Sequence, residues 1–221
     1  MVEESLHTVY YHANGYTHPL LPVIANDQQL AIHHFRWGLI PSWVKTLNEG
    51  VKWSNQSLNA KSETIFEKPS FKEAIMERRC IIPVTGFFEW KHVGKVKVPY
   101  YIHPTEAPFF LLAGVFSHWL DQQHHELHAT FSILTTEANE LMADIHHTQK
   151  RMPLMIHERN INAWIDKDLA KGAIVELMSP CEDTPMAAYP VSKMLSAKNV
   201  NSDIPEILLP SNDTPIQTTL F

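Results

Sequence analysis

Cysteine and glycine are scarce in this sequence, and no long apolar run is present. The 221 residues include two cysteines, Cys80 and Cys181, far apart in the chain. That number is too small for a disulfide framework, so a disulfide-stapled secreted domain is excluded and a reducing, cytoplasmic compartment is expected. No apolar run approaches the ~18 residues of a membrane span, and the chain opens without a signal-peptide core. Seven glycines against 15 prolines predict many bends and few flexible linkers.

Positive charge is also in deficit. The formal net charge is −6, which argues against the broad basic surface of many nucleic-acid-binding proteins and leaves room for a local basic groove. With 44% hydrophobic residues, a chain of this length can bury a complete core. No internal repeat or linker is visible, so a single domain is expected.

Hydrophobic periodicity predicts a mixed α+β domain. Alternating or continuously apolar segments indicate β-strands, and segments with apolar residues three and four apart indicate helices. The expected strands are 21–25, 30–37, 98–102, 109–119, 126–134, 154–156 and 186–191. The expected helices are 67–78, 135–144 (capped by threonine), 159–169 and 173–178, and the chain beyond Asn201 is expected to be irregular.

The stretch Arg79–Trp90, RCIIPVTGFFEW, places one carboxylate among large aromatic residues. A Pro/Gly break divides it, which predicts two strand segments that meet at a bend. Burial near aromatic rings disfavours a charged carboxylate, so Glu89 must be paired or chemically employed. The alternative is that Glu89 points to solvent, or forms an ordinary ion pair with Lys91 or Arg79.

The loop WGLIPSW, Trp37 to Trp43, has two tryptophans. Tryptophan buries a large area, so both are expected to anchor the core. The functional alternative is a platform on which unpaired bases stack.

A cluster of histidines at His124, His125 and His128 superficially resembles a zinc-protease site. That site requires two histidines one helical turn apart on a helix. Here the context predicts a turn and a strand, where residues i and i+4 lie ~13 Å apart. No metal site is expected there, and no cofactor is expected for the protein.

Four separated motifs together resemble one family. These are WGLIPSW, LNAKSET, RCIIPVTGFFEW with its downstream PYYI, and DIH followed by RMP. In this order they resemble the SRAP family (SOS-response-associated peptidase), which includes YedK-like abasic-site processing proteins. The resemblance implies an α+β fold with a β-barrel-like core and peripheral helices. It assigns residues 1–208 to the domain and 209–221 to an irregular tail.

The family resemblance also implies a chemistry. Members bind single-stranded DNA and attach to abasic sites: an N-terminal cysteine condenses with the sugar aldehyde, and its thiol closes a thiazolidine ring. Carried onto this sequence, Asn59 helps to position the nucleophile, Glu89 handles protons, and His146 assists ring opening or Schiff-base formation, with His147 as the alternative. An aldehyde–amine condensation needs an acid and a base, which a carboxylate and an imidazole can supply.

The resemblance implies that Lys61 contacts a DNA phosphate, because many family members have an arginine there. A local basic groove that contains Lys150 and Arg151, with Trp43 nearby as a stacking ring, completes the expected DNA-contacting set. The resemblance also implies abasic single-stranded DNA as the partner. No membrane contact is expected, and the protein is expected to be a monomer with a cytoplasmic location that becomes nucleoid-associated on DNA.

The beginning of the chain departs from the family pattern. Family members begin Met-Cys-Gly, whereas this chain begins Met1-Val2-Glu3, and neither of its cysteines can offer an α-amine. An internal methionine as the first residue is one interpretation, and a catalytically silent DNA-binding member is another. Rival functions are a peptidase or hydrolase that releases its own initiator methionine, with abasic-site lyase activity, and a non-enzymatic ligand- or protein-binding module.

Overall fold

A five-stranded β-barrel forms the centre of the described structure. The computed structural model describes residues 9–26, 30–146, 148–179 and 185–211. Strands β2, β1, β4, β7 and β8 pair in this order, and β2 pairs with β8 in parallel to close the barrel. Their bounds are β1 (Leu20–Asn26), β2 (Leu30–Trp37), β4 (Arg79–Val84), β7 (Phe110–Asp121) and β8 (Glu126–Glu137). Strands β3 (Asn59–Lys61) and β9 (Arg151–Pro153) extend the sheet beside β8. The predicted α+β fold with a barrel-like core is confirmed.

The barrel is closed around apolar side chains from every wall. β7 is buried along nearly its whole length, as its continuous apolar run predicts. Phe35 from β2, Phe116 from β7 and Phe131 from β8 belong to the same buried cluster, which also receives Cys80. Cys80 has 0% exposure and packs there as a small hydrophobic group.

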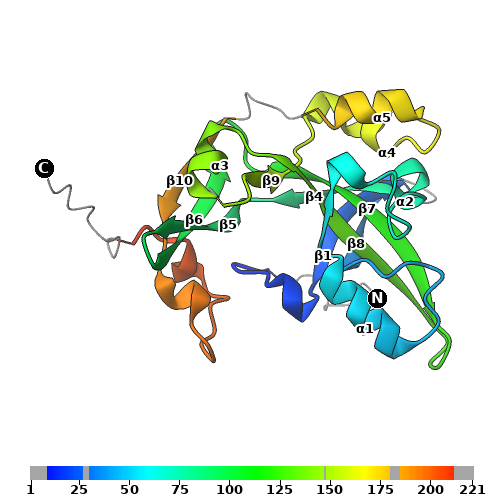
Figure 1. The fold of residues 1–221 in the computed structure, drawn as a ribbon, viewed down its shortest axis with the longest axis horizontal. Coiled ribbons are helices and arrows are strands. Elements are labelled where there is room, and N and C mark those ends of the chain that lie inside the picture. The colour runs from blue at the N-terminus through cyan, green and yellow to red at the C-terminus, as the bar shows by residue number, and fades with distance from the viewer. Residues whose placement is uncertain (1–8, 27–29, 147, 180–184, 212–221) are drawn as a thin grey trace, which may run out of the picture.

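A second, three-stranded sheet stands beside the barrel (Figure 1). It contains β5 (Phe87–Val93), β6 (Val96–Pro104) and β10 (Met186–Pro190) in the order β10-β6-β5. The bend predicted inside RCIIPVTGFFEW is the turn at Thr85 and Gly86 that carries the chain from β4 into β5. Only glycine fits there, since a Cβ atom on Gly86 would lie 2.4 Å from the carbonyl oxygen of Ile102.

Helices cover the outside of the barrel. Figure 1 shows α4 and α5 together above one end and α1 below the other. Arg79, at the start of β4, has 2% exposure, and its guanidinium donates to main-chain carbonyls at the ends of α2 and α4. The bounds are α1 (Leu47–Gln56), α2 (Ala74–Glu77), α3 (Glu140–Ile145), α4 (Ile161–Ile165) and α5 (Lys171–Leu177). No helix in the described ranges is long and apolar enough to cross a membrane.

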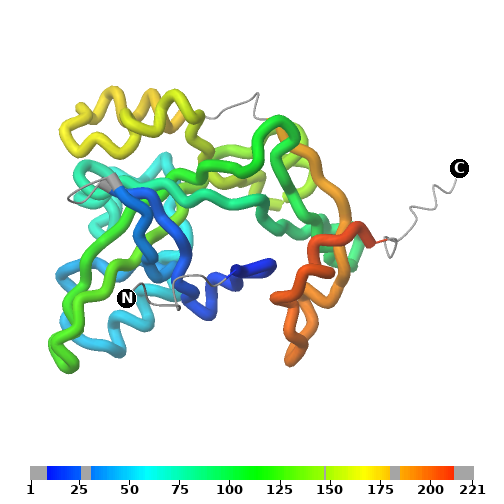
Figure 2. Tube along the Cα trace, turned by 180° about the vertical axis from the view of Figure 1, so that it is seen from behind, coloured from blue at the N-terminus to red at the C-terminus, as the bar shows by residue number. Residues whose placement is uncertain are grey.

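Segments from opposite ends of the described chain meet between the barrel and the second sheet. The carboxylate of Asp203 accepts the backbone N–H groups of Tyr11 and His12 at 2.6 and 3.0 Å. The ring of His12 packs edge-on against Phe88 of β5. Figure 2 shows the same approach, with the blue N-terminal segment reaching toward the orange and red C-terminal lobe.

Four sequence-based expectations about local structure are wrong. The helix expected over 67–78 is reduced to α2, because Pro69 interrupts the segment and turns occupy most of it. Helix α3 is capped by Asn139 rather than by threonine, since β8 continues through Thr135 and Thr136. The short strand after the DIH motif is β9, three residues before the expected 154–156.

The chain beyond Asn201 is the fourth correction, because it is structured as far as it is described. It forms a 3₁₀ helix (Pro205–Leu208) whose Ile207 has 0% exposure. The other 3₁₀ helices are Gly15–Thr17, Ser62–Thr64, Glu158–Asn160 and Lys193–Ser196. Residues 212–221 of the expected tail lie outside the described residues.

Candidate functional site

Glu89 and His146 lie together although 57 positions separate them in the chain. Glu89 is on β5, and His146 is the residue that ends α3. Glu89 Oε2 lies 3.4 Å from His146 Nδ1, and the two side chains are 24% and 21% exposed. A half-buried carboxylate beside an imidazole is an arrangement that can hold and move protons.

The alternative partners of Glu89 are engaged elsewhere. Lys91 Nζ lies 2.5 Å from Asp144 Oδ2, and the Arg79 guanidinium donates to main-chain carbonyls behind the barrel. The second carboxylate oxygen of Glu89 accepts the backbone N–H of Trp90 at 2.8 Å. The interpretation of Glu89 as an ion-pair partner of Lys91 or Arg79 is therefore wrong.

The surroundings of His146 fix its tautomer. Its Nδ1 lies 3.1 Å from the carbonyl oxygen of Arg151 and 3.4 Å from the Glu89 carboxylate. Both neighbours are acceptors, so Nδ1 must carry the proton, and Nε2 is left to accept or donate a second one. His147 lies outside the described residues.

Arg151 ties the His146 loop to the segment that follows β3. Its guanidinium lies 2.6 Å from Glu63 and also donates to the carbonyl oxygen and hydroxyl of Thr135. Burial alone would raise the pKa of Glu63, but the hydrogen bond and the charge of Arg151 lower it below its usual value. The pair therefore remains charged at neutral pH and links Ser62–Thr64 to β9.

Asn59 and Lys61 are both exposed on β3. The strand runs parallel to β8, and its register places Asn59 opposite Ile133 and Lys61 opposite Thr135. Thr135 is also the partner of the Arg151 side chain. The structure thus brings the LNAKSET segment to the loop of His146, and it brings Glu89 to the imidazole itself.

The two tryptophans of the WGLIPSW loop have different environments. Trp37 stacks against Phe131 and donates its indole N–H to the carbonyl of Leu58 at 2.9 Å, as expected of a core anchor. Trp43 is 51% exposed and meets Trp53 edge-on at 5.3 Å. The expectation that both tryptophans are core anchors is therefore wrong for Trp43, about half of which is exposed to solvent.

Lys150 is exposed in the loop before β9, where its backbone N–H donates to the carbonyl of His146 at 2.8 Å.

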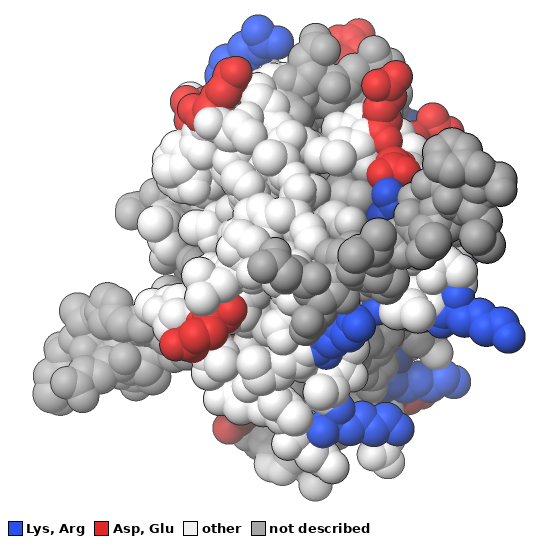
Figure 3. All heavy atoms as spheres, turned by 90° about the vertical axis from the view of Figure 1, so that its left-hand side faces the viewer, with Lys and Arg blue, Asp and Glu red and all other residues white. Residues whose placement is uncertain are grey.

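Figure 3 looks at the side of the molecule formed by the second sheet and the chain that follows β10. Several Lys and Arg side chains gather in the lower right of that face, while Asp and Glu lie mainly near its top. A local concentration of positive charge therefore exists on a chain of net charge −6.

The other chemically suggestive groups lie apart from this site. Burial raises the pKa of the Cys80 thiol well above its usual value, which makes it a poor nucleophile. His124 bonds Asp121 at 2.7 Å in a turn, and His128 stacks on Trp119 within β8, the turn-and-strand context that the sequence predicts.

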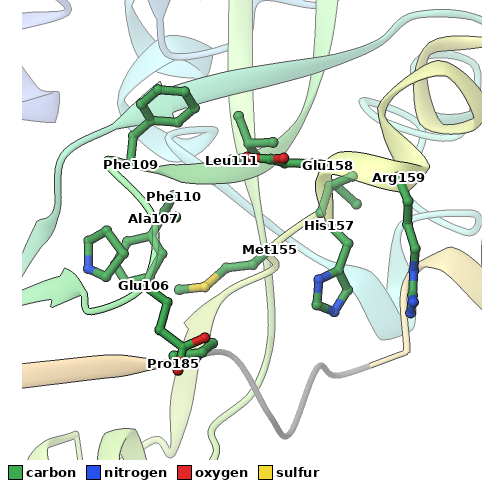
Figure 4. Close-up of a pocket in the computed structure, with 12 residues that line it drawn as sticks. Glu106, Ala107, Phe109, Phe110, Leu111, Met155, His157, Glu158, Arg159 and Pro185 are labelled. Atoms are coloured by element: carbon green, nitrogen blue, oxygen red, sulfur yellow. The ribbon is translucent and has the colours of Figure 1, made fainter.

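A cavity of about 630 Å³ lies where the β6–β7 loop faces the chain after β9. Figure 4 shows Met155 near its centre, with His157 and Arg159 on one side and Glu106 with Pro185 on the other. It is lined by none of the predicted site residues.

Two acidic residues of the site region, Asp144 and Glu63, lie inside the sequence motifs themselves. Asp144 belongs to the DIH motif, and Glu63 belongs to LNAKSET. Each forms an ion pair beside a predicted site residue, Asp144 with Lys91 and Glu63 with Arg151. Their position inside the motifs that contain His146 and Asn59 was the available indication.

Comparisons with known proteins agree with this architecture. The family model described as SOS response associated peptidase (SRAP) matches residues 2–198. The abasic site processing protein YoqW of Bacillus subtilis is 35% identical over 191 residues, which cover 86% of this chain and 81% of the relative. The abasic site processing protein HMCES of Gallus gallus is 30% identical, covering 84% of this chain and 59% of the relative.

A solved structure shows the same fold. The crystal structure of a Bacteroides thetaiotaomicron protein superposes with a TM-score of 0.87 at 38% identity, covering 95% of this chain and 89% of the other. The barrel with its flanking sheet, the four ordered motifs and the length of the match lead to one assignment: this chain belongs to the SRAP family.

Proposed function

We propose that this protein binds single-stranded DNA at abasic sites and links itself covalently to them as part of the DNA damage response. Two findings support the proposal: its relatives are named abasic site processing proteins, and the Glu89 carboxylate lies 3.4 Å from the imidazole of His146, so that the two can act as an acid–base pair. The pair carries the argument, because it supplies the proton transfers that a condensation with an aldehyde requires.

The chemistry follows from the arrangement of these two side chains. The nitrogen of an α-amine adds to the aldehyde carbon of the opened sugar, and one N–H proton moves to the aldehyde oxygen, which becomes a hydroxyl. His146, as an imidazolium stabilised by Glu89 through Nδ1–H, donates a proton from Nε2 to this hydroxyl, which leaves as water. The nitrogen then gives its second proton back to Nε2. The product is a C=N bond, and one water is released.

A cysteine completes the link. Its S–H adds across the C=N bond, so that sulfur joins the carbon, nitrogen takes the proton, and a thiazolidine ring closes. The 221 residues begin Met1-Val2-Glu3, and Cys80 is buried inside the barrel. The proposal therefore concerns a polypeptide with an N-terminal cysteine, in which Asn59 helps to place the amine.

DNA is held by Trp43, Lys61, Lys150 and Arg151 in this proposal. The half-exposed ring of Trp43 stacks on an unpaired base, and the three cations bind the phosphates. Binding must then weaken as salt rises, because each neutralised phosphate releases counterions. Removal of Lys150 is expected to reduce the slope of log K against log salt by about 1. Lys171, the first residue of α5, is a matched control that leaves the slope unchanged, because its ammonium lies over the ring of Phe66.

The decisive test is a crosslinking assay. The chain as printed and a chain extended with Met-Cys-Gly are incubated with single-stranded DNA that carries one abasic site, and products are separated on a denaturing gel. We expect a shifted band for the extended chain and no stable band for the printed one. E89Q and H146A in the extended chain should lower the rate at which the shifted band forms by about a hundredfold or more. The affinity of both variants for DNA should stay within about twofold of the parent. An extended chain that gives no shifted band would remove the proposed function.

A peptidase limited to its own initiator methionine is the second candidate, favoured by the description of the family model. It is tested by the intact mass of the extended chain after expression. Loss of methionine in the parent and its retention in both E89Q and H146A would support self-processing. Equal loss in all three would assign the cleavage to the host.

A further inference from the structure

Two bridges side by side join β5 to the end of α3. One is the contact between Glu89 and His146, at 3.4 Å. The other is the ion pair between Lys91 and Asp144, at 2.5 Å. Glu89 and Lys91 are two residues apart on a strand and therefore project from the same face. Their partners are also two residues apart, at the point where α3 ends.

Helix α3 depends on such contacts for its position. It has six residues, Glu140–Ile145, and a helix of that length is not stable by itself in water. Its first turn is held by Asn139, whose side chain accepts the N–H of Met142 at 3.0 Å. At the other end Asp144 places a negative charge near the negative end of the helix dipole, an unfavourable arrangement that the ammonium of Lys91 offsets.

We propose that the Lys91–Asp144 ion pair is a positioning clamp that sets the distance between Glu89 and His146. This inference rests on the proposed function, since the distance matters for the proton transfers of crosslinking. Neither residue of the clamp touches the reacting atoms. The clamp acts by holding the last turn of α3 against β5, so that Nδ1 stays directed at the Glu89 carboxylate.

The test uses the Met-Cys-extended chain and single-turnover crosslinking to abasic single-stranded DNA. D144N and K91M each break the clamp, and K91R preserves its charge. The matched control is E73Q, which removes another exposed ion pair, Arg78–Glu73 at 2.8 Å, far from this site in the fold. The side-chain exposures of the two pairs are similar, 27% and 66% for the clamp against 25% and 58% for the control.

We expect D144N and K91M to slow crosslinking about tenfold, below the ~100-fold loss that a 1 Å misplacement can cause. K91R and E73Q should stay within about twofold of the parent. All variants should melt within about 3 °C of the parent, because exposed ion pairs add little stability. The double variant K91M/D144N should be no slower than either single one. D144N added to E89Q should cause no further loss, because the clamp acts through Glu89.

A second readout is independent of DNA and so separates this inference from the proposed function. Nitrogen-15 and proton shifts of the His146 Nδ1–H group report the hydrogen bonds that this group donates. The Arg151 carbonyl keeps the proton on Nδ1 in every variant, so the parent and E73Q should give the same Nδ1–H signal, and D144N a shifted one, because the contact with Glu89 is lost. If the parent fails to crosslink but D144N shifts the Nδ1–H signal, the clamp stands and the proposed function falls. If D144N matches the parent in its Nδ1–H signal, and in crosslinking rate where the parent crosslinks, the clamp is overturned.

Discussion

Replacement of Arg79 by methionine should severely destabilise the fold. The guanidinium is 2% exposed and lies at the start of β4. It donates to the carbonyls of Ile75, Met76 and Trp164 at 2.6 Å each, and also to that of Asp166. Burial lowers the pKa of Arg79, and the charge of Asp166 opposes this effect, yet an arginine side chain stays charged.

The size of the loss follows from these acceptors. Methionine fills much of the same volume but donates no hydrogen bond, so the carbonyls at the ends of α2 and α4 lose their partner. The bonds to Ile75 and Trp164 are the buried ones. Each buried group left unsatisfied costs about 1–3 kcal/mol, which gives about 2–6 kcal/mol for the pair. A domain with a stability of about 5–15 kcal/mol would lose a large part of it.

The neighbouring residue provides a matched control. Arg78 forms ion pairs with Glu73 and Glu77, whose side chains are 58% and 62% exposed. R78M should therefore cost no more than about 1 kcal/mol. Urea unfolding followed by tryptophan fluorescence compares the two variants at equal m-value. Equal losses for R79M and R78M, or an R79M loss below about 1 kcal/mol, would refute the assignment of Arg79 as the donor that holds both helix ends.

Three further outcomes are expected. G86A should lower the free energy of unfolding by about 1–3 kcal/mol, because its Cβ would meet a β6 carbonyl at 2.4 Å. G172A on α5 is the matched control, because no atom lies within 4 Å of the Cβ that it would add. The hydrogen bond to Asp121 raises the pKa of His124 above 6.5, so this contribution to stability is complete below pH 6.5 and is lost as the pH rises through the raised value. An NMR titration should show a lower His124 pKa in D121N, and an unchanged value would contradict the contact. In a variant whose other cysteine is replaced by serine, the buried Cys80 thiol should react with maleimide only after urea unfolds the protein. Labelling of the folded variant as fast as an exposed free thiol would disprove the burial of Cys80.

Local pattern was enough to predict much of the barrel. Residues 30–37 alternate along the chain, and β2 has those bounds. The apolar run after Pro108 predicts a strand buried on both faces, and β7 is that strand. These features depend on side-chain period and burial, which neighbouring residues encode. Neighbouring residues also predict the Pro/Gly break after β4, where the chain passes from the barrel into the second sheet.

The same local reasoning failed where distant contacts decide the outcome. Thr135 and Thr136 suit a helix cap, but pairing of β8 with β9 keeps them in a strand, and Asn139 caps α3 instead. The exposure of Trp43 depends on which surfaces pack around the WGLIPSW loop, and the composition of that loop does not determine it.

The sequence by itself determined that Glu89 lies among aromatic residues, where a buried carboxylate would need a partner, and it left open whether the side chain points to solvent. Only the tertiary structure decided which partner it has. Lys91 is near Glu89 in the sequence, but its ammonium forms an ion pair with Asp144. His146 contacts the Glu89 carboxylate because α3 packs on β5. An ion pair forms only between side chains that lie within a few ångströms of each other. These side chains come that close only after the second sheet and α3 have packed together.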